Sequence, residues 1–507
     1  MSRTIRFVST SRRWAVVAAL FLIVAGGAAA RFADLATNPG GLYPDEAAEG
    51  LSARHILEDP TYRPVFVPED GGREALYAYS LAVGFGIGGQ SVEVVRAVAA
   101  FWGVLGIVGI FLLVRRFGTG AGLAAAAWAA GSLWLIVVSR DGMRNTISPL
   151  FGAFGLLFLI AWSNRPSRTM AVIAGATAAI VSLYTYNPLK MLAILAFLWV
   201  IWLRYSDRPT YQRLVVHAPA FMVSFAVLAA PMVAAAFANP QAFFGRAIGV
   251  TVFNPALVPE TDPLTHVIRT LGQFTFFGDP NARHDVAALP LLGWPLTILA
   301  LVGLWVLWKG RRTASHSLIL LAFPVFLIPQ LIATEGGAPH FLRGLGLAAP
   351  MAIAIGLGAQ ELWRRLAATI SARARWSVGR ASAVSAGAFG LLFLAVGIGS
   401  ASTYLLRPIT DRYDPFAYDL VAMAELSQPG TDAVVVDEFG AYTVTFLRER
   451  VLVLAPGAPL ERAGVSRVLA RSIADLRAAV GEAAAANAVP VAWDPLGQPR
   501  VWAATPD

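Results

Sequence analysis

Residues 93–116 read EVVRAVAAFWGVLGIVGIFLLVRR. The stretch stays largely apolar for about 20 residues, the length that a helix needs to cross the hydrocarbon core of a bilayer. It ends in Arg115 and Arg116, and such residues gather in the cytoplasmic loops of membrane proteins. The stretch therefore predicts a membrane-spanning helix whose second end lies in the cytoplasm.

The composition of the whole chain agrees with a membrane protein. Of its 507 residues, 57% are hydrophobic and 14% charged, whereas a soluble globular chain is about 45–50% apolar and about 25% charged. These values exclude a soluble enzyme, a disordered chain and a fibrous repeat. The net charge is +9, but the basic residues stand in short clusters between apolar runs, which argues against nucleic-acid binding. Cysteine is absent, which excludes disulfides, iron–sulfur clusters and thiolate zinc sites.

Apolar length and flanking arginine together predict about eleven spans. Every Arg-dense loop then falls on one side, so the N-terminus is expected in the cytoplasm and the C-terminus outside it. The chain is predicted to be a mainly α-helical, multi-pass protein of the cell membrane with about eleven transmembrane helices. The spans are Trp14–Ala30, Glu93–Val114, Ala121–Val138, Leu150–Trp162, Met170–Tyr184, Leu189–Leu203, Leu214–Ala236, Leu291–Trp308, Leu318–Ala333, Leu345–Leu362 and Ser382–Leu405.

Two of the apolar segments admit another interpretation. Trp14–Ala30 follows a basic stretch and ends in three alanines, so it also fits a cleavable signal peptide; we interpret it as the first span because many spans follow. Leu76–Gly89 is apolar but short and glycine-rich. If it crossed the membrane, every later loop would change sides, so we expect a helix lying in the outer interface.

The predicted domains are a transmembrane domain over 1–405 and an extracytoplasmic domain over 406–507. The first carries two long outer loops, 31–90 and 239–290, and the second loop is long enough to be functional. The tail is expected to form a small α/β domain. Its predicted strands and helices are Ala433–Val436, Val451–Leu454, Pro415–Leu426 and Ser472–Ala485.

The sharpest polar cluster follows the first span and reads Tyr43-Pro44-Asp45-Glu46-Ala47. Two adjacent carboxylates at the membrane surface can accept a proton from a hydroxyl or amine nucleophile. A structural interpretation is equally specific, because Pro44 suits the first turn of a helix and the carboxylates would complement its dipole. From the residues alone, both interpretations remain open.

Together with two further motifs, this cluster resembles the GT-C membrane glycosyltransferases, which include protein O-mannosyltransferases, lipid A aminoarabinose transferases and their bacterial relatives. The second motif, Gly71 to Tyr79, precedes the expected interfacial helix, and the third is Ser139 to Asn145 at the outer end of the third span. Relatives carry a basic residue, often followed by Pro, where this chain has Arg73-Glu74, and often an acidic residue where Asn145 falls. The resemblance covers about residues 1–405 and is densest over 1–165.

The resemblance implies transfer of a sugar from a polyprenyl-phosphate-linked donor to an acceptor hydroxyl or amine on the extracytoplasmic face. Asp45 would be the catalytic base and Glu46 would orient it. The donor's lipid stays in the bilayer, so no nucleotide site is needed, and the sequence has neither a Walker A motif nor a dinucleotide fingerprint. We expect no cofactor. The acceptor can be a protein, a glycan, a glycolipid or a cell-wall polymer, and the expected partners are the donor and membrane lipids, with no nucleic acid.

Basic residues on the outer face are candidates for binding the donor phosphate, because Arg can grip phosphate with two donors at once. Arg73 occupies the family's basic position; the alternative is a contact with lipid headgroups. Arg140, Asp141 and Arg144 are also predicted to bind substrate; the two arginines flank Asp141, and an internal salt bridge is the alternative for these three residues.

A later motif, His340 to Arg343, opens the tenth span. Relatives often carry basic or aromatic residues there, so His340 and Arg343 are predicted to bind substrate; an ordinary helix start is the alternative. Tyr186 ends the fifth span in an aromatic cluster, which suits a sugar platform or an interface belt.

The outer segment Gly278 to Asp285 holds a histidine and two flanking carboxylates, a set that can bind a divalent cation. Its Asp-Pro-Asn sequence also predicts a turn, and the chain has no His-Glu-x-x-His motif. We therefore predict no metal site.

A transporter or flippase for a lipid-linked or small substrate is the alternative function. Transporters usually carry charged or broken helices near mid-membrane, often in two corresponding halves. Here the charges concentrate at the ends of the spans and no internal symmetry is visible, which favours the glycosyltransferase. A non-catalytic sensor whose tail binds a ligand is a weaker alternative.

Overall fold

The computed structural model describes residues 10–69, 71–461 and 464–506. They form two compact units. A helical unit comprises residues up to Ala33, Ala99–Arg140 and Arg144–Tyr404. A second unit comprises Asp34–Val98, Asp141–Met143 and the chain from Leu405 onward. The outer loop that carries the Asp-Glu motif therefore groups with the C-terminal tail rather than with the helices.

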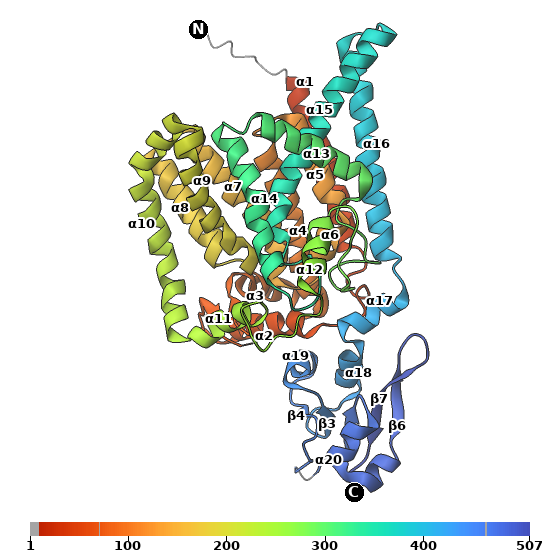
Figure 1. Ribbon diagram of the computed structural model, residues 1–507. Coiled ribbons are helices and arrows are strands. Elements are labelled where there is room, and N and C mark those ends of the chain that lie inside the picture. Colours follow the sequence, from red (N-terminus) through yellow and green to blue (C-terminus); the bar gives the residue numbers. More distant parts are fainter. Residues whose placement is uncertain (1–9, 70, 462–463, 507) are drawn as a thin grey trace. The chain divides into compact units, whose positions relative to one another are not determined.

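Helices occupy all eleven predicted spans (Figure 1). Within the described residues, eight helical segments are long and apolar enough to cross a membrane, and two predicted spans are shorter apolar helices, Arg168–Leu183 and Gly293–Lys309. The eleven spans correspond to α1 (Thr10–Phe32), α4 (Val92–Val114), α5 (Thr119–Gly131) with α6 (Leu133–Val138), α7 (Ser148–Asn164), α8 (Arg168–Leu183), α9 (Met191–Ser206), α10 (Arg208–Ala238), α13 (Gly293–Lys309), α14 (Ala314–Ile332), α15 (Ala348–Ala374) and α16 (Val378–Leu405).

The third span is broken where the sequence predicts one continuous helix. Ser132 adopts an extended conformation between α5 and α6, and its side chain accepts a hydrogen bond from the backbone N–H of Leu135. Ser competes with helical hydrogen bonds in this way and is a favoured N-cap. The break therefore has a local cause in the side chain of Ser132.

Glycines let the helices of this unit approach closely. A Cβ built on Gly303 of α13 would lie 1.8 Å from the carbonyl oxygen of Ala354 on α15, and one on Gly358 of α15 would lie 1.8 Å from that of Leu299. Without a hydrophobic driving force between helices in lipid, such small residues supply the packing surface.

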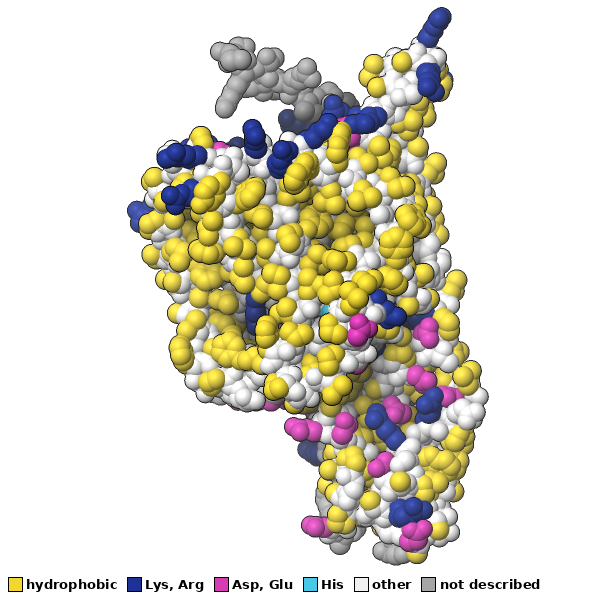
Figure 2. Space-filling view, in the orientation of Figure 1, with side chains coloured by type: hydrophobic (Ala, Val, Ile, Leu, Met, Phe, Trp, Pro, Cys, Tyr) yellow, Lys and Arg dark blue, Asp and Glu magenta, His cyan; other side chains and the backbone are white. Residues whose placement is uncertain are grey.

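Charges are concentrated at one end of the helical unit. Figure 2 shows Lys and Arg gathered at the end where α15 and α16 meet, next to a broad, largely uncharged band. Because charge is costly in the bilayer core, this band is the part that suits the hydrocarbon. The chain is thus a multi-pass membrane protein.

The tail forms a five-stranded sheet in the order β4-β3-β5-β7-β6. Strands β4 and β5 run parallel to β3, whereas β7 is antiparallel to β5 and β6. The small α/β domain is confirmed, but three strands (β5, β6 and β7) and two helices (α17 and α19) are additional to the prediction. The elements are α17 (Ile409–Tyr413), α18 (Tyr418–Leu426), β3 (Asp432–Val435), α19 (Glu438–Leu447), β4 (Leu452–Leu454), β5 (Arg467–Ala470), α20 (Ile473–Ala486), β6 (Val489–Trp493) and β7 (Pro499–Ala504).

Both faces of this sheet are covered by apolar residues. Alternate residues of a strand point to opposite faces: Val434 packs in one cluster with Leu420 of α18 and Val444 of α19, whereas Ala433 packs in another with Leu476 of α20. The sheet is therefore a layer between helices, as expected for strands that include a parallel pair.

Candidate functional site

The Asp-Glu motif forms the first turn of α2 (Pro44–Glu58). Tyr43 is extended and Pro44 occupies the first helical position, where its missing N–H costs nothing. Asp45 and Glu46 then lie in the first turn, next to backbone N–H groups that favour negative charge. The predicted helix start is thus confirmed, and it fixes where the two carboxylates point.

Asp45 and Glu46 have different environments. Glu46 is fully buried, whereas Asp45 is half-buried. Among the described residues, Asp45 makes no hydrogen bond or ion pair. The side chain of Asp45 is therefore available to an incoming group, whereas that of Glu46 is enclosed by the protein.

Glu46 is held by a residue that the sequence analysis missed. Its Oε2 lies 3.2 Å from Nε of Arg96, and both side chains are buried. The same oxygen accepts the backbone N–H of Gly142 at 3.3 Å, from the third sequence motif. Arg96 was the one basic residue inside the apolar run 93–114, and that isolation was the signal that could have identified it.

Arg96 is in turn fixed by the loop before the motif. Its Nη1 donates to the carbonyl oxygens of Leu35 at 3.1 Å and Pro39 at 2.6 Å, and its Nη2 donates to that of Gly41. A buried cation with one carboxylate and three carbonyl partners is well satisfied. Arg96 therefore ties the start of α4 to both the loop before α2 and its first turn.

Arg73 lies beside the same helix. It belongs to β2 (Arg73–Glu74), which pairs with β1 (Phe66–Val67), and α3 (Leu76–Gly88) follows. Its side chain is 2% exposed, and Nη2 donates to Oγ of Ser52 at 3.2 Å and to the carbonyl oxygen of Ala48 at 3.4 Å. The structure thus brings the predicted phosphate ligand Arg73 to α2, one turn beyond the carboxylates.

The C-terminal tail supports α2 within this unit. Thr443 of α19 donates its hydroxyl to the carbonyl oxygen of Leu42 at 3.1 Å. A Cβ on Gly50 would lie 2.5 Å from the ring of Phe446, so only glycine allows this approach without movement. Arg54 donates to Glu449 at 2.6 Å. The tail therefore contributes packing to the motif helix.

In the helical unit, Arg140 is directed at backbone rather than at an open surface. Its Nη1 donates to the carbonyl oxygens of Ala30 at 3.1 Å and Arg31 at 2.9 Å. Its guanidinium carbon lies 4.7 Å from the ring centre of Tyr404. These contacts show a packing role, and phosphate binding by Arg140 stays a prediction, as does a substrate role for Asp141, which is buried in the second unit.

Three other predicted residues come together in the helical unit. The guanidinium carbon of Arg144 lies 5.9 Å from the ring centre of Tyr186. Burial lowers the pKa of Arg343, which has Tyr186 and Arg246 among its neighbours; the positive charge of Arg246 adds to the shift. Nη1 of Arg343 donates to the carbonyl oxygens of Ala333 and Glu335. The arrangement gathers positive charge around one aromatic ring.

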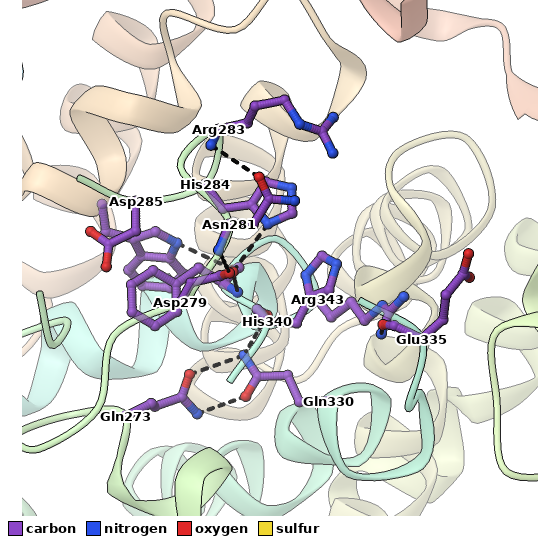
Figure 3. Close-up of polar contacts among 12 residues, drawn as sticks. Gln273, Asp279, Asn281, Arg283, His284, Asp285, Gln330, Glu335, His340 and Arg343 are labelled. Carbon is purple, nitrogen blue, oxygen red and sulfur yellow. Dashed lines mark hydrogen bonds and ion pairs between the residues drawn. The ribbon is translucent and has the colours of Figure 1, made fainter. Parts of the chain in front are cut away.

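His340 lies in a second polar cluster of the same unit, with Asp279 and His284 (Figure 3). Oδ2 of Asp279 lies 3.1 Å from Nδ1 of His284 and accepts the backbone N–H of Phe341 at 2.7 Å. The two imidazole rings are 4.6 Å apart, centre to centre. Burial lowers the pKa of both histidines, which disfavours their protonated forms.

Buried amides fix the backbone that carries His340. Gln330 of α14 exchanges two side-chain hydrogen bonds with Gln273, at 2.6 and 3.1 Å, and donates to the carbonyl oxygen of His340 at 3.1 Å. The backbone oxygen of Gln330 also contacts Nε2 of His266 at 2.8 Å. This network sets the position of residues 340–344 relative to α14.

Comparison with known proteins identifies relatives of this architecture. Residues 75–255 match the family model of dolichyl-phosphate-mannose-protein mannosyltransferase. No curated protein sequence matches the chain significantly.

Two solved proteins share the fold at low sequence identity. ArnT from Cupriavidus metallidurans bound to undecaprenyl phosphate is 14% identical, with a TM-score of 0.60 over 98% of this chain and 98% of that chain. Its apo form is 13% identical, with a TM-score of 0.57 over 98% of each chain. The archaeal oligosaccharyltransferase AglB from Archaeoglobus fulgidus, in complex with an inhibitory peptide and a dolichol-phosphate, is 15% identical, with a TM-score of 0.56 over 94% of this chain and 72% of that chain. The predicted resemblance to GT-C glycosyltransferases is thus confirmed.

Proposed function

We propose that this protein transfers a sugar from a polyprenyl-phosphate-linked donor to an acceptor hydroxyl or amine on the extracytoplasmic face of the membrane. The observation that carries the proposal is the difference in environment between the two carboxylates of the Asp-Glu motif. Glu46 is held by Arg96 at 3.2 Å, while Asp45 is half-buried and its side chain has no partner in the part of the chain that the structure describes. A positioned carboxylate within reach of the acceptor is what base catalysis requires. The family match over residues 75–255 and the two relatives with bound polyprenyl phosphates support the choice of donor.

In the proposed reaction, the acceptor oxygen or nitrogen attacks the anomeric carbon of the donor sugar. Asp45 takes the proton of the acceptor as the new glycosidic bond forms. The bond between the anomeric carbon and the phosphate oxygen breaks, and the electron pair leaves with the phosphate. The donor phosphodiester becomes a polyprenyl monophosphate and gains negative charge, so the site needs cations where that charge develops.

Basic residues supply those cations in our proposal. Arg73 is fixed beside α2 by Ser52 at 3.2 Å. In the helical unit, Arg144 lies over Tyr186 at 5.9 Å, and Arg343 follows His340. We assign phosphate binding to these basic residues and sugar stacking to Tyr186.

Arg73 gives the sharpest test of phosphate binding. Replacing Arg73 by Ala is expected to weaken donor binding and slow transfer, and replacing it by Lys to retain part of the activity, because an ammonium keeps the charge but loses the planar fork. Loss of one charge-assisted contact costs about 1.5–3 kcal/mol, or about ten- to a hundredfold. Steady-state transfer kinetics with varied donor measures both effects.

Arg144→Ala and Arg343→Ala are the comparisons for Arg73→Ala. A far larger loss in these two variants than in Arg73→Ala would place the phosphate at the helical unit's cluster. Unchanged donor KM and kcat in all three would refute phosphate binding by these residues.

The orientation of the chain decides which face carries the reaction. α15 and α16 meet in an exposed basic turn near Arg375, and the sheet domain follows α16. A periplasmic-type phosphatase reporter fused after Asp507 is expected to be active, whereas one fused after Arg375 should be silent. The opposite pattern would place the Asp-Glu motif in the cytoplasm.

A reconstituted assay distinguishes transfer from transport. The purified protein is reconstituted in liposomes with a polyprenyl-phosphate sugar that carries a label in its sugar moiety. Candidate acceptors are added outside the liposomes. A transferase releases polyprenyl phosphate and moves the label to the acceptor. Movement of intact donor between leaflets, with the sugar–phosphate bond unbroken, would support the flippase instead.

A further inference from the structure

Two loops of the helical unit place three metal-binding side chains together. Asp279 and His284 come from the segment between α12 (Pro263–Gly272) and α13, and His340 from the segment between α14 and α15. One potential ligand atom from each lies within 4.8 Å of the others. From the sequence, only Asp279 and His284 were neighbours, and no metal site was predicted there.

We propose that Asp279, His284 and His340 bind one divalent transition-metal ion, with zinc as the best-suited ion. Two imidazoles and one carboxylate are a ligand set typical of Zn²⁺. Zinc is bound at about 2.0–2.2 Å in tetrahedral geometry, so its ligand atoms lie about 3.3–3.5 Å apart. Ligand atoms that are at most 4.8 Å apart therefore have to close by no more than about 1.5 Å around the ion, a change within the reach of side-chain torsions.

The unsatisfied group in this cluster is His340. Its Nδ1 is buried, and among the residues that the structure describes it has no hydrogen-bond partner. A buried polar atom without a partner is destabilising, and such groups in native proteins often mark an ion or a water. A metal ion would give this nitrogen its partner.

The carboxylate is held in place for such a role. Asp279 Oδ2 accepts the backbone N–H of Phe341 at 2.7 Å, directly after His340 in the chain. Asp279 therefore already joins the two loops, and its contact with His284 fixes the orientation of that ring. Carboxylates that orient histidines or ligate beside them are typical of zinc centres.

The neighbouring arginines reduce the affinity for a cation without blocking the cluster. Nη1 of Arg343 is directed at the carbonyl oxygens of Ala333 and Glu335. Figure 3 shows the Arg283 side chain running away from Asp279. The bound ion would fasten residues 279–284 to residue 340, three positions before Arg343. This role does not depend on the proposed function.

The test uses full-length protein in detergent. Any histidine tag is removed, and a chelator strips the protein of metal. We expect one equivalent of Zn²⁺ per chain by mass spectrometry after dialysis, and visible d–d absorption when Co²⁺ replaces Zn²⁺. His340→Gln and Asp279→Asn should each lower Zn²⁺ affinity by at least about a hundredfold, because losing even an outer-shell partner of a ligand costs about ten- to a hundredfold. His316→Gln is the matched control, because His316 is partly exposed, bonds Thr313 and lies outside the cluster, and it should bind as the wild type does.

Thermal melting separates binding from folding. Zn²⁺ should raise the melting temperature of the wild type and of His316→Gln but not that of His340→Gln. If His340→Gln does not fold, the stoichiometry and Co²⁺ spectrum of the wild type still decide the matter. Less than one equivalent of tightly bound Zn²⁺ in the wild type, or unchanged affinity in folded His340→Gln, would overturn the proposal.

Discussion

Replacing Asp45 by Asn is expected to abolish sugar transfer while the protein still folds. The amide cannot take the acceptor's proton, and loss of a general base costs about 10²–10⁴-fold in rate. Folding should persist, because Asp45 is half-buried without a partner in the described chain, and its charge at the helix start is worth about 0.3–1 kcal/mol. Turnover of purified protein and its melting temperature measure the two effects separately.

Asp59→Asn is the matched control for this experiment. Asp59 is exposed, follows the last turn of the same helix and bonds Thr61. The control should keep wild-type turnover. Near-normal turnover in folded Asp45→Asn would remove Asp45 from the mechanism.

Breaking the Glu46–Arg96 pair is expected to cause the largest loss of stability. Both side chains are 1% exposed, so Arg96→Leu leaves a carboxylate buried without its cation, which costs about 3–5 kcal/mol. Glu46→Gln leaves the opposite charge and should cost a similar amount. From the sequence, Glu46 was expected only to orient the base. The buried pair with Arg96 adds a role in stability. Thermal melting in detergent provides the measurement.

The double variant and a surface control complete this test. Glu46→Gln with Arg96→Leu should cost less than the sum of the two singles, because partners in contact are not additive. Arg365→Leu removes an exposed pair with Glu361, where the expected cost is about 0.3–0.5 kcal/mol. An Arg96→Leu protein as stable as Arg365→Leu would contradict the structural role of the pair.

The sequence was most informative about the spans. Apolar runs such as 93–114 have the length of the bilayer core, so their boundaries follow from composition alone. The break at Ser132 was missed because a single serine inside an apolar run carries a weak signal, whereas its bond to Leu135 depends on local geometry. Strands β5 to β7 were missed. Pro490 lies inside β6 and Pro499 begins β7, and a proline argues against a strand.

The candidate site was predictable in part. Asp45 and Glu46 stand adjacent in the chain, and Pro44 predicts the helix that carries them. Arg96 is 50 residues from Glu46, and nothing in a single sequence reports that distance in space. The same holds for His340, which joins Asp279 and His284 only through the packing of two loops.

One measurement tests the central claim most directly. Purified wild-type protein and Asp45→Asn are incubated with a panel of polyprenyl-monophosphate sugars and candidate acceptors, and released polyprenyl phosphate is quantified together with labelled product. The account predicts that at least one donor is consumed by the wild type, with equal amounts of lipid phosphate and glycosylated acceptor, and that Asp45→Asn forms neither. Equal consumption by both proteins, or transfer only from nucleotide sugars, would contradict it.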